Sequence, residues 1–334
     1  MNESIYPYTF EPVFRNYIWG GRTLETMFGR NLPPGTVAES WEISGHPSSP
    51  TAVSNGPLAG QTLPELLELL GEALVGRRSQ AMLQRGKFPL LVKLLDANRQ
   101  LSVQVHPDDD YAARREDGEL GKTEMWYVLY AKPGAYLIYG LQRNVTPQSF
   151  RQALKAGQLE TCLHQLPVKA GDAVFIPSGS VHAIMDGIVI AEIQQNSDTT
   201  YRVYDWNRVG ADGKPRPLHI EKALDVINFD MVEPGPFNPQ PLPAVDGVER
   251  ALISGCSYFN VERMSLAEGA TFNGHTDGST FEIWGCIEGE TRLTWAGQPV
   301  AMPAIRFALV PATLGDFAIE ANTAATMLRA YVPE

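Results

Sequence analysis

Polar side chains occupy alternate positions in residues 101–110, LSVQVHPDDD, where valines separate Ser102, Gln104 and His106. A two-residue period is typical of a β-strand with one polar and one apolar face, so these three side chains should point the same way. An imidazole and an amide on one strand face can ligate a metal ion.

The spacing around His182 is G-x5-P-x-G-x2-H over residues 171–182. It resembles the second conserved motif of the cupin superfamily, whose double-stranded β-helix barrels use that histidine as a metal ligand. The first cupin motif is an H-x-H pair followed by a glutamate, and this sequence has Gln104, His106 and Glu124 in that order. The resemblance implies that Gln104, His106, Glu124 and His182 converge on a metal ion. Such N/O ligands suit Zn²⁺, one per chain, with one or two positions left for water or substrate.

Cationic residues accompany these candidate ligands. Lys93 lies within the apolar run LLVKLLD, where a buried lysine requires an anionic partner. Lys122 lies two residues before Glu124, and Arg202 follows Asp198 in the segment after His182. If the three cations line one cavity, they would bind a phosphate or stabilise a developing oxyanion. The alternatives are that Lys93 extends to the surface and that Arg202 is an ordinary surface residue.

Short apolar runs separated by 30 glycines and 25 prolines predict a β-rich protein with frequent turns. The expected strands of the first part are 90–96, 101–106, 124–131, 135–139, 173–176 and 188–193. The expected strands of the tail are 258–264, 281–287, 291–295, 305–310 and 326–332. The expected helices are 62–74, 146–157 and 219–229, of which the first two have a threonine N-cap and an early proline.

The tail weakly repeats the first part. FALVPATLGDF (307–317) is similar to GDAVFIPSGSVH (171–182), and FEIWGCIEGE (281–290) is similar to TEMWYVLYAKPG (123–134). We therefore expect a mainly β protein, with a cupin (double-stranded β-helix, jelly-roll) barrel, a few helices and a second, smaller cupin-like β-barrel. The expected domains are a metal-binding cupin domain with helical insertions (1–232), a linker rich in proline (233–244) and a cupin-like domain without metal ligands (245–334).

A series of motifs makes the resemblance more specific. They are NYIWGG (16–21), AESWEISGHPSSP (38–50), PLLVKLLDA (89–97), LSVQVHPDD (101–109), GKTEMWYVL (121–129), PSGSVHAI (177–184) and QNSDTTYRVYDW (195–206). In this order the series resembles the type I mannose-6-phosphate isomerases in their shorter bacterial form, over residues 5–232. The tail matches only loosely, as the second, metal-free cupin domain of that family. Ile184 departs from the pattern, because the longer enzymes have an aromatic residue there.

The resemblance assigns roles to residues of this sequence. The zinc ligands would be Gln104, His106, Glu124 and His182. The catalytic residues would be Arg202, near the reacting carbons, and Lys122. The residues expected to contact or surround the substrate are Ser102, Lys93, Trp19, Glu39, Glu192 and Asp198.

The implied reaction is the interconversion of mannose 6-phosphate and fructose 6-phosphate through a cis-enediol. The proton could be carried by Lys122 with a lowered pKa, by Glu192, by Asp198 or by a hydroxide ion on the metal. A hydride-like shift, with the metal only orienting the substrate, is the alternative mechanism. Two other functions are an iron-dependent cupin dioxygenase, which would favour three histidines, and a sugar-binding cupin without catalysis.

Composition narrows the functional class. The chain has 334 residues, 44% hydrophobic content and a formal net charge of −11, which argues against nucleic acid or an anionic membrane as a partner. No apolar run approaches the roughly 18 residues of a membrane helix, and the N-terminal segment does not resemble a secretory signal. Cys162, Cys256 and Cys286 are far apart, so we expect neither disulfides nor a thiolate zinc site. A cytoplasmic enzyme, monomer or homodimer, with a phosphorylated hexose as substrate is expected.

Overall fold

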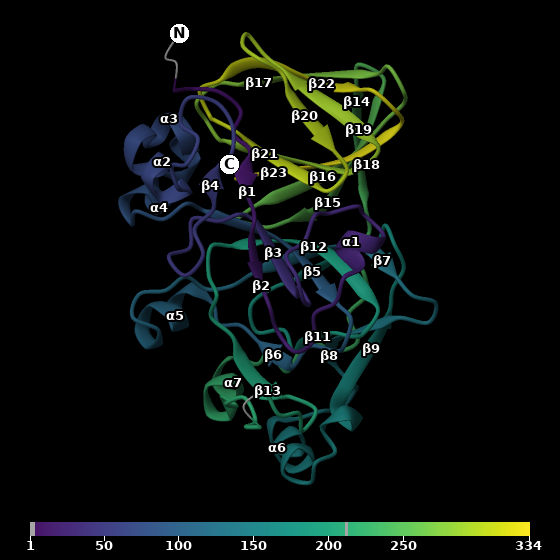
Figure 1. Ribbon diagram of the computed structural model, residues 1–334. Helices are drawn as coiled ribbons and strands as arrows, with labels where there is room; N and C mark the ends of the chain where they lie inside the picture. The colour runs from purple at the N-terminus through teal and green to yellow at the C-terminus, as the bar shows by residue number, and fades with distance from the viewer. Residues whose placement is uncertain (1–3, 211–212) are drawn as a thin grey trace. The chain divides into compact units, whose positions relative to one another are not determined.

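The structure is a computed structural model that describes residues 4–210 and 213–334, and most of its regular structure is antiparallel strand (Figure 1). The chain forms two compact units, each built from several segments. Unit 1 comprises Met1–Val13, Trp41–Lys93 and Asn238–Glu334, and unit 2 comprises Phe14–Ser40 and Leu94–Phe237. The mainly β fold class is therefore confirmed, while the expected domain limits 1–232, 233–244 and 245–334 stay a prediction.

Unit 2 contains the candidate ligands. Its elements are α1 (Thr23–Thr26), β6 (Val103–Val105), α5 (Asp109–Arg115), β7 (Glu124–Ala131), β8 (Tyr136–Leu141), α6 (Pro147–Lys155), a 3-10 helix (Leu159–Cys162), β9 (Leu163–Pro167), β10 (Ala173–Ile176), β11 (His182–Ile184), β12 (Ile188–Gln195), β13 (Tyr201–Tyr204) and α7 (Ile220–Val226). The strands β2 (Val13–Arg15), β3 (Glu39–Ile43) and β5 (Leu90–Ala97) contain the points where the chain passes from one unit to the other.

Unit 1 contains the C-terminal strands and the N-terminal helices. Its elements are β1 (Phe10–Glu11), β4 (Ala52–Val53), α2 (Leu63–Leu70), α3 (Glu72–Val75), a 3-10 helix (Arg77–Ser79), α4 (Gln80–Gln84), β14 (Gln240–Val245), β15 (Val248–Gly255), β16 (Asn260–Leu266), β17 (Thr271–Thr276), β18 (Glu282–Glu288), β19 (Glu290–Thr294), β20 (Val300–Pro303), β21 (Arg306–Val310), β22 (Gly315–Ala321) and β23 (Ala325–Tyr331).

The strand orders of the main sheets repeat. One sheet has the order β10-β7-β12-β5-β3-β2, and unit 1 has the corresponding order β21-β18-β23-β16-β15-β14. The second sheet is β13-β6-β11-β8-β9 in unit 2 and β17-β22-β19-β20 in unit 1. Among the described residues, hydrogen bonds leave these as separate sheets, so the expected barrels are pairs of sheets that do not close into a continuous cylinder.

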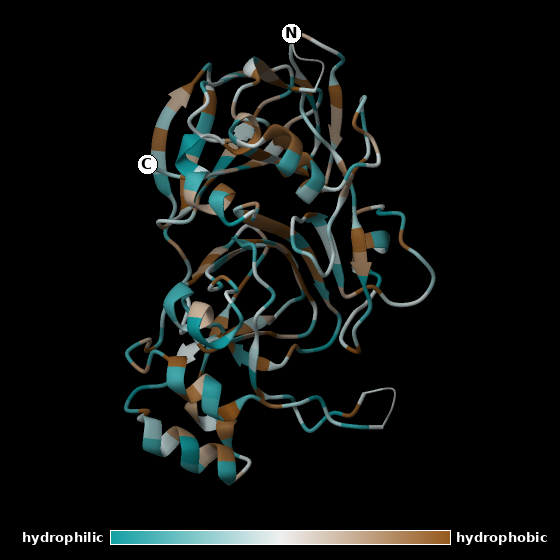
Figure 2. Cartoon of the chain, turned by 90° about the vertical axis from the view of Figure 1, so that its left-hand side faces the viewer, coloured by the Kyte–Doolittle hydropathy of each residue, from teal (hydrophilic) through white to brown (hydrophobic). Residues whose placement is uncertain are grey.

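The core of unit 2 lies on both faces of its five-stranded sheet. Between this sheet and β7, β10 and β12, one cluster of buried side chains includes Trp126, Ile176 and Leu137. On the other face, a second cluster combines strand valines with side chains of α6 and α7. Phe150, Ala153 and Leu154 of α6 lie at the i, i+3, i+4 spacing of an apolar helix face, and this helix carries both brown and teal residues in Figure 2.

The expected helices exist with corrected ends. Residues 62–74 form two helices, α2 and α3, because Gly71 between them has φ +50 and leaves the right-handed helical region. Thr62 begins α2 with a capping box to Glu65, and Thr146 caps α6 in the same way with Ser149. None of the helices in 4–210 and 213–334 is long and apolar enough to cross a membrane.

Part of the expected linker is a strand. Gln240–Val245 forms β14, which pairs with β15. Two prolines, Pro241 and Pro243, are tolerated there because β14 is an edge strand, where missing N–H donors break no inner ladder.

Glycine at 140 is a conformational requirement of β8. Its φ is +74, and it lies within a register irregularity between Ile138 and Leu141. A Cβ atom at this position would lie 2.5 Å from Cδ of Pro234 and 2.7 Å from the carbonyl oxygen of Met231. Gly134 also has a positive φ, +77, but no atom lies within 4 Å of the place where its Cβ atom would be.

We predict that Gly140→Ala lowers the free energy of unfolding by about 3 kcal/mol or more, because left-handed strain and a backbone clash add. Gly134→Ala should cost only the strain, about 1–2 kcal/mol. Urea unfolding of both variants measures the difference. An equal decrease in the free energy of unfolding of both variants would show that Pro234 and Met231 can move away from a Cβ atom at position 140.

Candidate metal centre and active site

His106, Glu124 and His182 form a buried cluster, in which the candidate ligand atoms all lie within 4.8 Å of one another. Nε2 of His106 is 3.3 Å from Oε1 of Glu124, and Nε2 of His182 is 3.9 Å from Oε2 of the same carboxylate. Each of the three side chains is only 1% exposed. Within the described parts of the chain, this is the one group of His, Cys, Asp and Glu side chains arranged to hold a metal ion.

Strand alternation produces this convergence. In β6, Val103 and Val105 pack in the cluster that contains α6 and α7, so Gln104 points to the opposite face. In β11, His182 is the Cα partner of Gln104, and its neighbours Val181 and Ala183 pack on the helical side. Glu124 begins β7 in the other sheet. The two imidazoles and the carboxylate thus meet between two sheets.

Backbone carbonyl groups determine the tautomer of both histidines. Nδ1 of His106 donates to the carbonyl oxygen of Thr199 at 2.8 Å, and Nδ1 of His182 donates to that of Ser180 at 2.9 Å. Burial lowers the pKa of His106, and burial together with His106 lowers the pKa of His182 to about 3. Both rings are therefore neutral and carry the Nε2 lone pair toward Glu124, as metal ligands require.

Trp126 holds two carboxylates with one N–H group. Its Nε1 donates to Oε2 of Glu124 at 3.1 Å and to Oε2 of Glu192 at 2.9 Å. Trp126 and Glu192 are Cα partners on β7 and β12. The sequence contained a signal for this residue, because Trp126 lies two positions after Glu124 and shares its strand face.

Lys122 supplies positive charge to the carboxylates. Its Nζ lies 2.8 Å from Oε1 of Glu124, and the residue is 4% exposed. Burial opposes the charge of both groups, but Lys122 and the histidines hold the pKa of Glu124 well below its usual range. Burial likewise opposes the charge of Lys122, and Glu124, Glu192 and Asp198 raise its pKa. Of the proton carriers that the sequence left open, Lys122 with a lowered pKa is therefore not supported.

A second group of polar contacts connects Arg202 with the cluster. Arg202 on β13 is the Cα partner of Gln104, and its Nε donates to Oγ of Ser102 at 3.2 Å. Oγ of Ser102 donates to Oε1 of Gln104 at 3.4 Å, and Nε2 of Gln104 is 3.3 Å from Nε2 of His182. Rotating the Gln104 amide by 180° would turn its oxygen toward His182, which the expected ligand role of Gln104 requires.

Further arginines and a tyrosine surround Arg202, and the sequence reasoning missed them. Arg208 and Arg216 both donate to Asp205, with Nη2 to Oδ1 distances of 2.5 Å and 2.6 Å. Burial, followed by Arg216, lowers the pKa of Arg202. The motif QNSDTTYRVYDW ends at Trp206, so only Asp205 of this set lay inside a recognised pattern.

Tyr17 is the missed tyrosine. Burial, then Glu39 and Asp198, raise the pKa of its hydroxyl to about 12. Its ring stacks on that of Trp19, with centroids 5.7 Å apart. Tyr17 therefore lies in the same environment as three residues that the resemblance assigned to the substrate.

Two of the expected substrate residues have clear structural contacts. Trp19 is 3% exposed and belongs to the inter-sheet core of unit 2. Lys93 is 2% exposed, with Nζ 4.2 Å from the ring centroid of Trp41, so it does not extend to the surface. Their roles in substrate binding stay predictions.

The paired sheets and the buried His106, Glu124 and His182 define a protein of the cupin class with a candidate metal centre. The chain is 38% identical to the mannose-6-phosphate isomerase ManA of Bacillus subtilis (strain 168), over 94% of this chain and 96% of the relative. A family model for the phosphomannose isomerase type I catalytic domain matches residues 8–128. The chain belongs to the type I phosphomannose isomerase family and is therefore an isomerase.

Two further similarities extend over the chain. A mannose-6-phosphate isomerase of Streptococcus mutans serotype c is 42% identical, over 77% of this chain and 79% of the relative. The crystal structure of the mannose 6-phosphate isomerase from Bacillus subtilis matches with a TM-score of 0.86 and 34% identity, covering 97% of this chain and 99% of that chain.

We predict that Trp126→Phe weakens metal binding by about 10–100-fold, because neither carboxylate keeps its indole donor. Titration of the metal-depleted protein with Zn²⁺ measures this affinity. The matched control is Trp284→Phe, which removes an equivalent 2.8 Å bond from Trp284 Nε1 to Glu282 in unit 1. An equal change in both variants would mean that Trp126 does not orient a ligand.

Proposed function

We propose that the chain is a zinc-dependent aldose–ketose isomerase that interconverts mannose 6-phosphate and fructose 6-phosphate through a cis-enediol. The observation that carries this proposal is the convergence of His106, Glu124 and His182 beside Lys122 and Arg202. The relatives that cover most of the chain are named mannose-6-phosphate isomerases, which supports the choice of substrate.

The donor set fits a divalent ion. Nε2 of His106 is buried and accepts no hydrogen bond from the described residues, which is costly unless another group occupies its lone pair. We propose that His106, His182 and Glu124 hold one Zn²⁺ per chain, with Gln104 as the fourth protein ligand after rotation of its amide. When bound, Zn²⁺ supplies Lewis acidity that polarises the carbonyl and hydroxyl oxygens of a substrate.

Arg202 and Ser102 are proposed to orient the substrate. Their 3.2 Å contact places a guanidinium and a hydroxyl together on the strand face of Gln104. Donors held in a fixed geometry can bind a phosphate group or stabilise an enediolate. The guanidinium of Arg202 also keeps its positive charge at any relevant pH. Lys93, Trp19 and Glu39 remain proposed substrate residues on the strength of their family motifs alone.

The proton carrier is proposed to be one of the groups around Lys122. Catalysis requires removal of the C2 proton and its return at C1, which a positioned base accelerates by about 10²–10⁴-fold. Glu192 has Oε2 bound to Trp126, and both Glu192 and Asp198 affect the pKa of Lys122. Lys122 is proposed to act by its charge near the reacting oxygens.

A cytoplasmic location is part of the proposal, because the substrate would be a phosphorylated sugar and Cys162, Cys256 and Cys286 are free thiols. Whether the enzyme is a monomer or a homodimer stays a prediction.

The direct test is a coupled assay of mannose 6-phosphate turnover, with metal analysis before and after chelation. We expect one zinc per chain, loss of turnover on chelation and recovery with Zn²⁺. His182→Ala should lose both metal and turnover while its circular dichroism is unchanged, and His164→Ala on β9 should keep both. Zinc and turnover retained in His182→Ala would exclude it as a ligand. Stoichiometric iron with oxygen consumption would replace the isomerase proposal.

For Arg202→Ala we expect kcat to fall by about 10²–10³-fold with zinc still bound, because a preorganised cation is lost in the transition state. Arg143→Ala is the control, since Arg143 pairs with Glu233 and its side chain is 78% exposed. A change confined to KM would instead make Arg202 a binding residue.

A further inference from the structure

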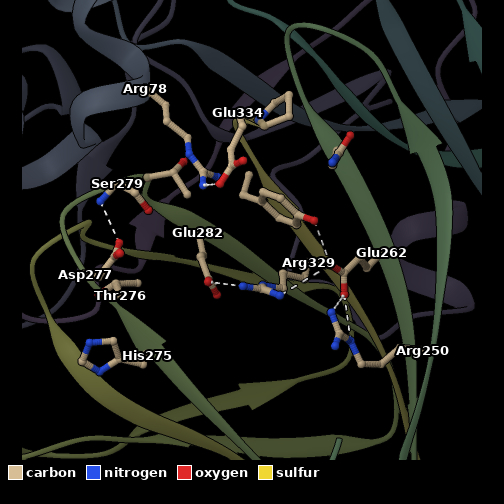
Figure 3. A pocket seen from close by; sticks show the side chains of 14 residues that line it. Arg78, Arg250, Glu262, His275, Thr276, Asp277, Ser279, Glu282, Arg329 and Glu334 are labelled. Carbon is tan, nitrogen blue, oxygen red and sulfur yellow. Dashed lines mark hydrogen bonds and ion pairs between the residues drawn. The ribbon is translucent and has the colours of Figure 1, made fainter. Parts of the chain in front are cut away.

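A polar cavity of about 590 Å³ lies in unit 1 (Figure 3). Its lining residues come mainly from β15, β16, β17, β18 and β23. Figure 3 shows Glu282, Arg329, Glu262 and Arg250 as a continuous row of linked charges. The isomerase proposal assigns no role to these residues.

This cavity occupies the place that corresponds to the metal centre of unit 2. Glu282 begins β18 and is bound at 2.8 Å by Nε1 of Trp284, just as Glu124 begins β7 and is bound by Trp126. Glu282 is the Cα partner of Val310 on β21, as Glu124 is of Ile176 on β10. The carboxylate and its indole donor are therefore repeated in the second unit.

The other positions of the site differ. Trp284 is the Cα partner of Arg329, whereas Trp126 is the Cα partner of Glu192. On the second sheet, β17-β22 corresponds to β6-β11, and β17 contributes Thr276 and the exposed His275 to the cavity lining, with Nδ1 of His275 2.6 Å from Oδ1 of Asp316. A guanidinium thus lies where unit 2 has a carboxylate, and the imidazole in the lining is exposed instead of buried beside the carboxylate.

The charges of this row balance. Arg329 forms ion pairs with Glu282 and, at 3.5 Å, with Glu262, whose other oxygen binds Nη2 of Arg250 at 2.7 Å. The hydroxyl of Tyr331 donates to Glu262 at 2.9 Å. Glu262 and Glu282 are only 1% and 2% exposed. Over the whole lining, three arginines (Arg78, Arg250 and Arg329) face four carboxylates (Glu262, Asp277, Glu282 and Glu334), so the net formal charge is only −1 and does not select a multivalent ion.

Stability alone does not explain these buried ions. A buried ion pair stabilises a fold little compared with apolar side chains of similar volume. In addition, Nε of Arg329 is buried and has no acceptor among the described residues, so the protein leaves part of this guanidinium unsatisfied. A ligand that exchanges hydrogen bonds with both signs of charge would account for the arrangement.

We propose that this cavity binds a neutral polyhydroxylated ligand of hexose size. Each hydroxyl can donate to a carboxylate and accept from a guanidinium, so adjacent hydroxyls match the alternating row. Asn260 and Ser279 add neutral polar groups to the lining. The volume lies in the range of about 300–1,000 Å³ that is typical of small-molecule sites.

The test is a titration of the zinc-loaded full chain with mannose, followed by calorimetry or ligand-observed NMR. The double variant Glu282→Met, Arg329→Met keeps the side-chain volume and removes a charged pair, so the fold should persist. We expect its mannose affinity to fall by about tenfold or more, because charge-assisted hydrogen bonds are lost. Mannose that binds at another place in the chain would bind equally to the original chain and to the double variant, so it does not contribute to the difference.

The matched control is Arg292→Met, Glu320→Met, which removes an exposed ion pair of 2.5 Å from the same unit and should leave the affinity unchanged. If the first double variant does not fold, Ser279→Trp, at a half-buried lining position, should block the cavity instead. Mannose affinity that survives in the folded test variant overturns the proposal. Binding of inorganic phosphate but not mannose, lost in the same variant, also overturns it and assigns an anion site. Isomerase turnover of each variant is measured separately, so failure of the isomerase proposal is distinguishable.

Discussion

The buried carboxylate of Glu124 is the constraint on which the rest of unit 2 depends. A carboxylate that is 1% exposed must be balanced by positive charge and hydrogen bonds, because water cannot solvate it. Lys122 supplies charge at 2.8 Å, and the indole of Trp126 supplies a donor at 3.1 Å. The two neutral imidazoles add Nε2 lone pairs beside the carboxylate, and that of His106 accepts no hydrogen bond from the described residues. Glu124, His106 and His182 therefore form a candidate metal centre.

The two units show how one strand arrangement supports two kinds of polar interior. The sheet orders and the positions of Glu124 and Glu282 correspond, and so does the tryptophan two residues later. In unit 2 histidines from the opposite sheet complete a candidate ligand set, and Lys122 pairs with Glu124 beside it. In unit 1 Arg329 provides the balancing charge from within the chain. A change at a few inward positions thus replaces a metal ligand set by an internal ion pair.

The sequence predicted the fold class and the convergence of His106, Glu124 and His182, because strand alternation and motif spacing are local signals. It also predicted the similarity of the two units from the segments around Glu124 and Glu282. It missed β17 and β22, whose sequences TFNGHT and GDFAIEA mix small and polar residues and give weak alternation. The sequence could not show that Tyr17, Arg208 and Arg216 lie near Arg202, because these proximities arise from contacts between distant segments. It left Lys122 with a lowered pKa among the possible proton carriers, because the direction of that pKa depends on three carboxylates brought together by folding.

The edge strand β14 has a consequence for the behaviour of the chain in concentrated solution. Alternate N–H groups of a strand face opposite sides, and Pro241 and Pro243 remove two donors from the same side. β14 pairs on one side only, with β15, and is an edge of its six-stranded sheet. Prolines in an edge strand disfavour pairing with a strand from another copy, so this edge is a poor template for amyloid-like growth.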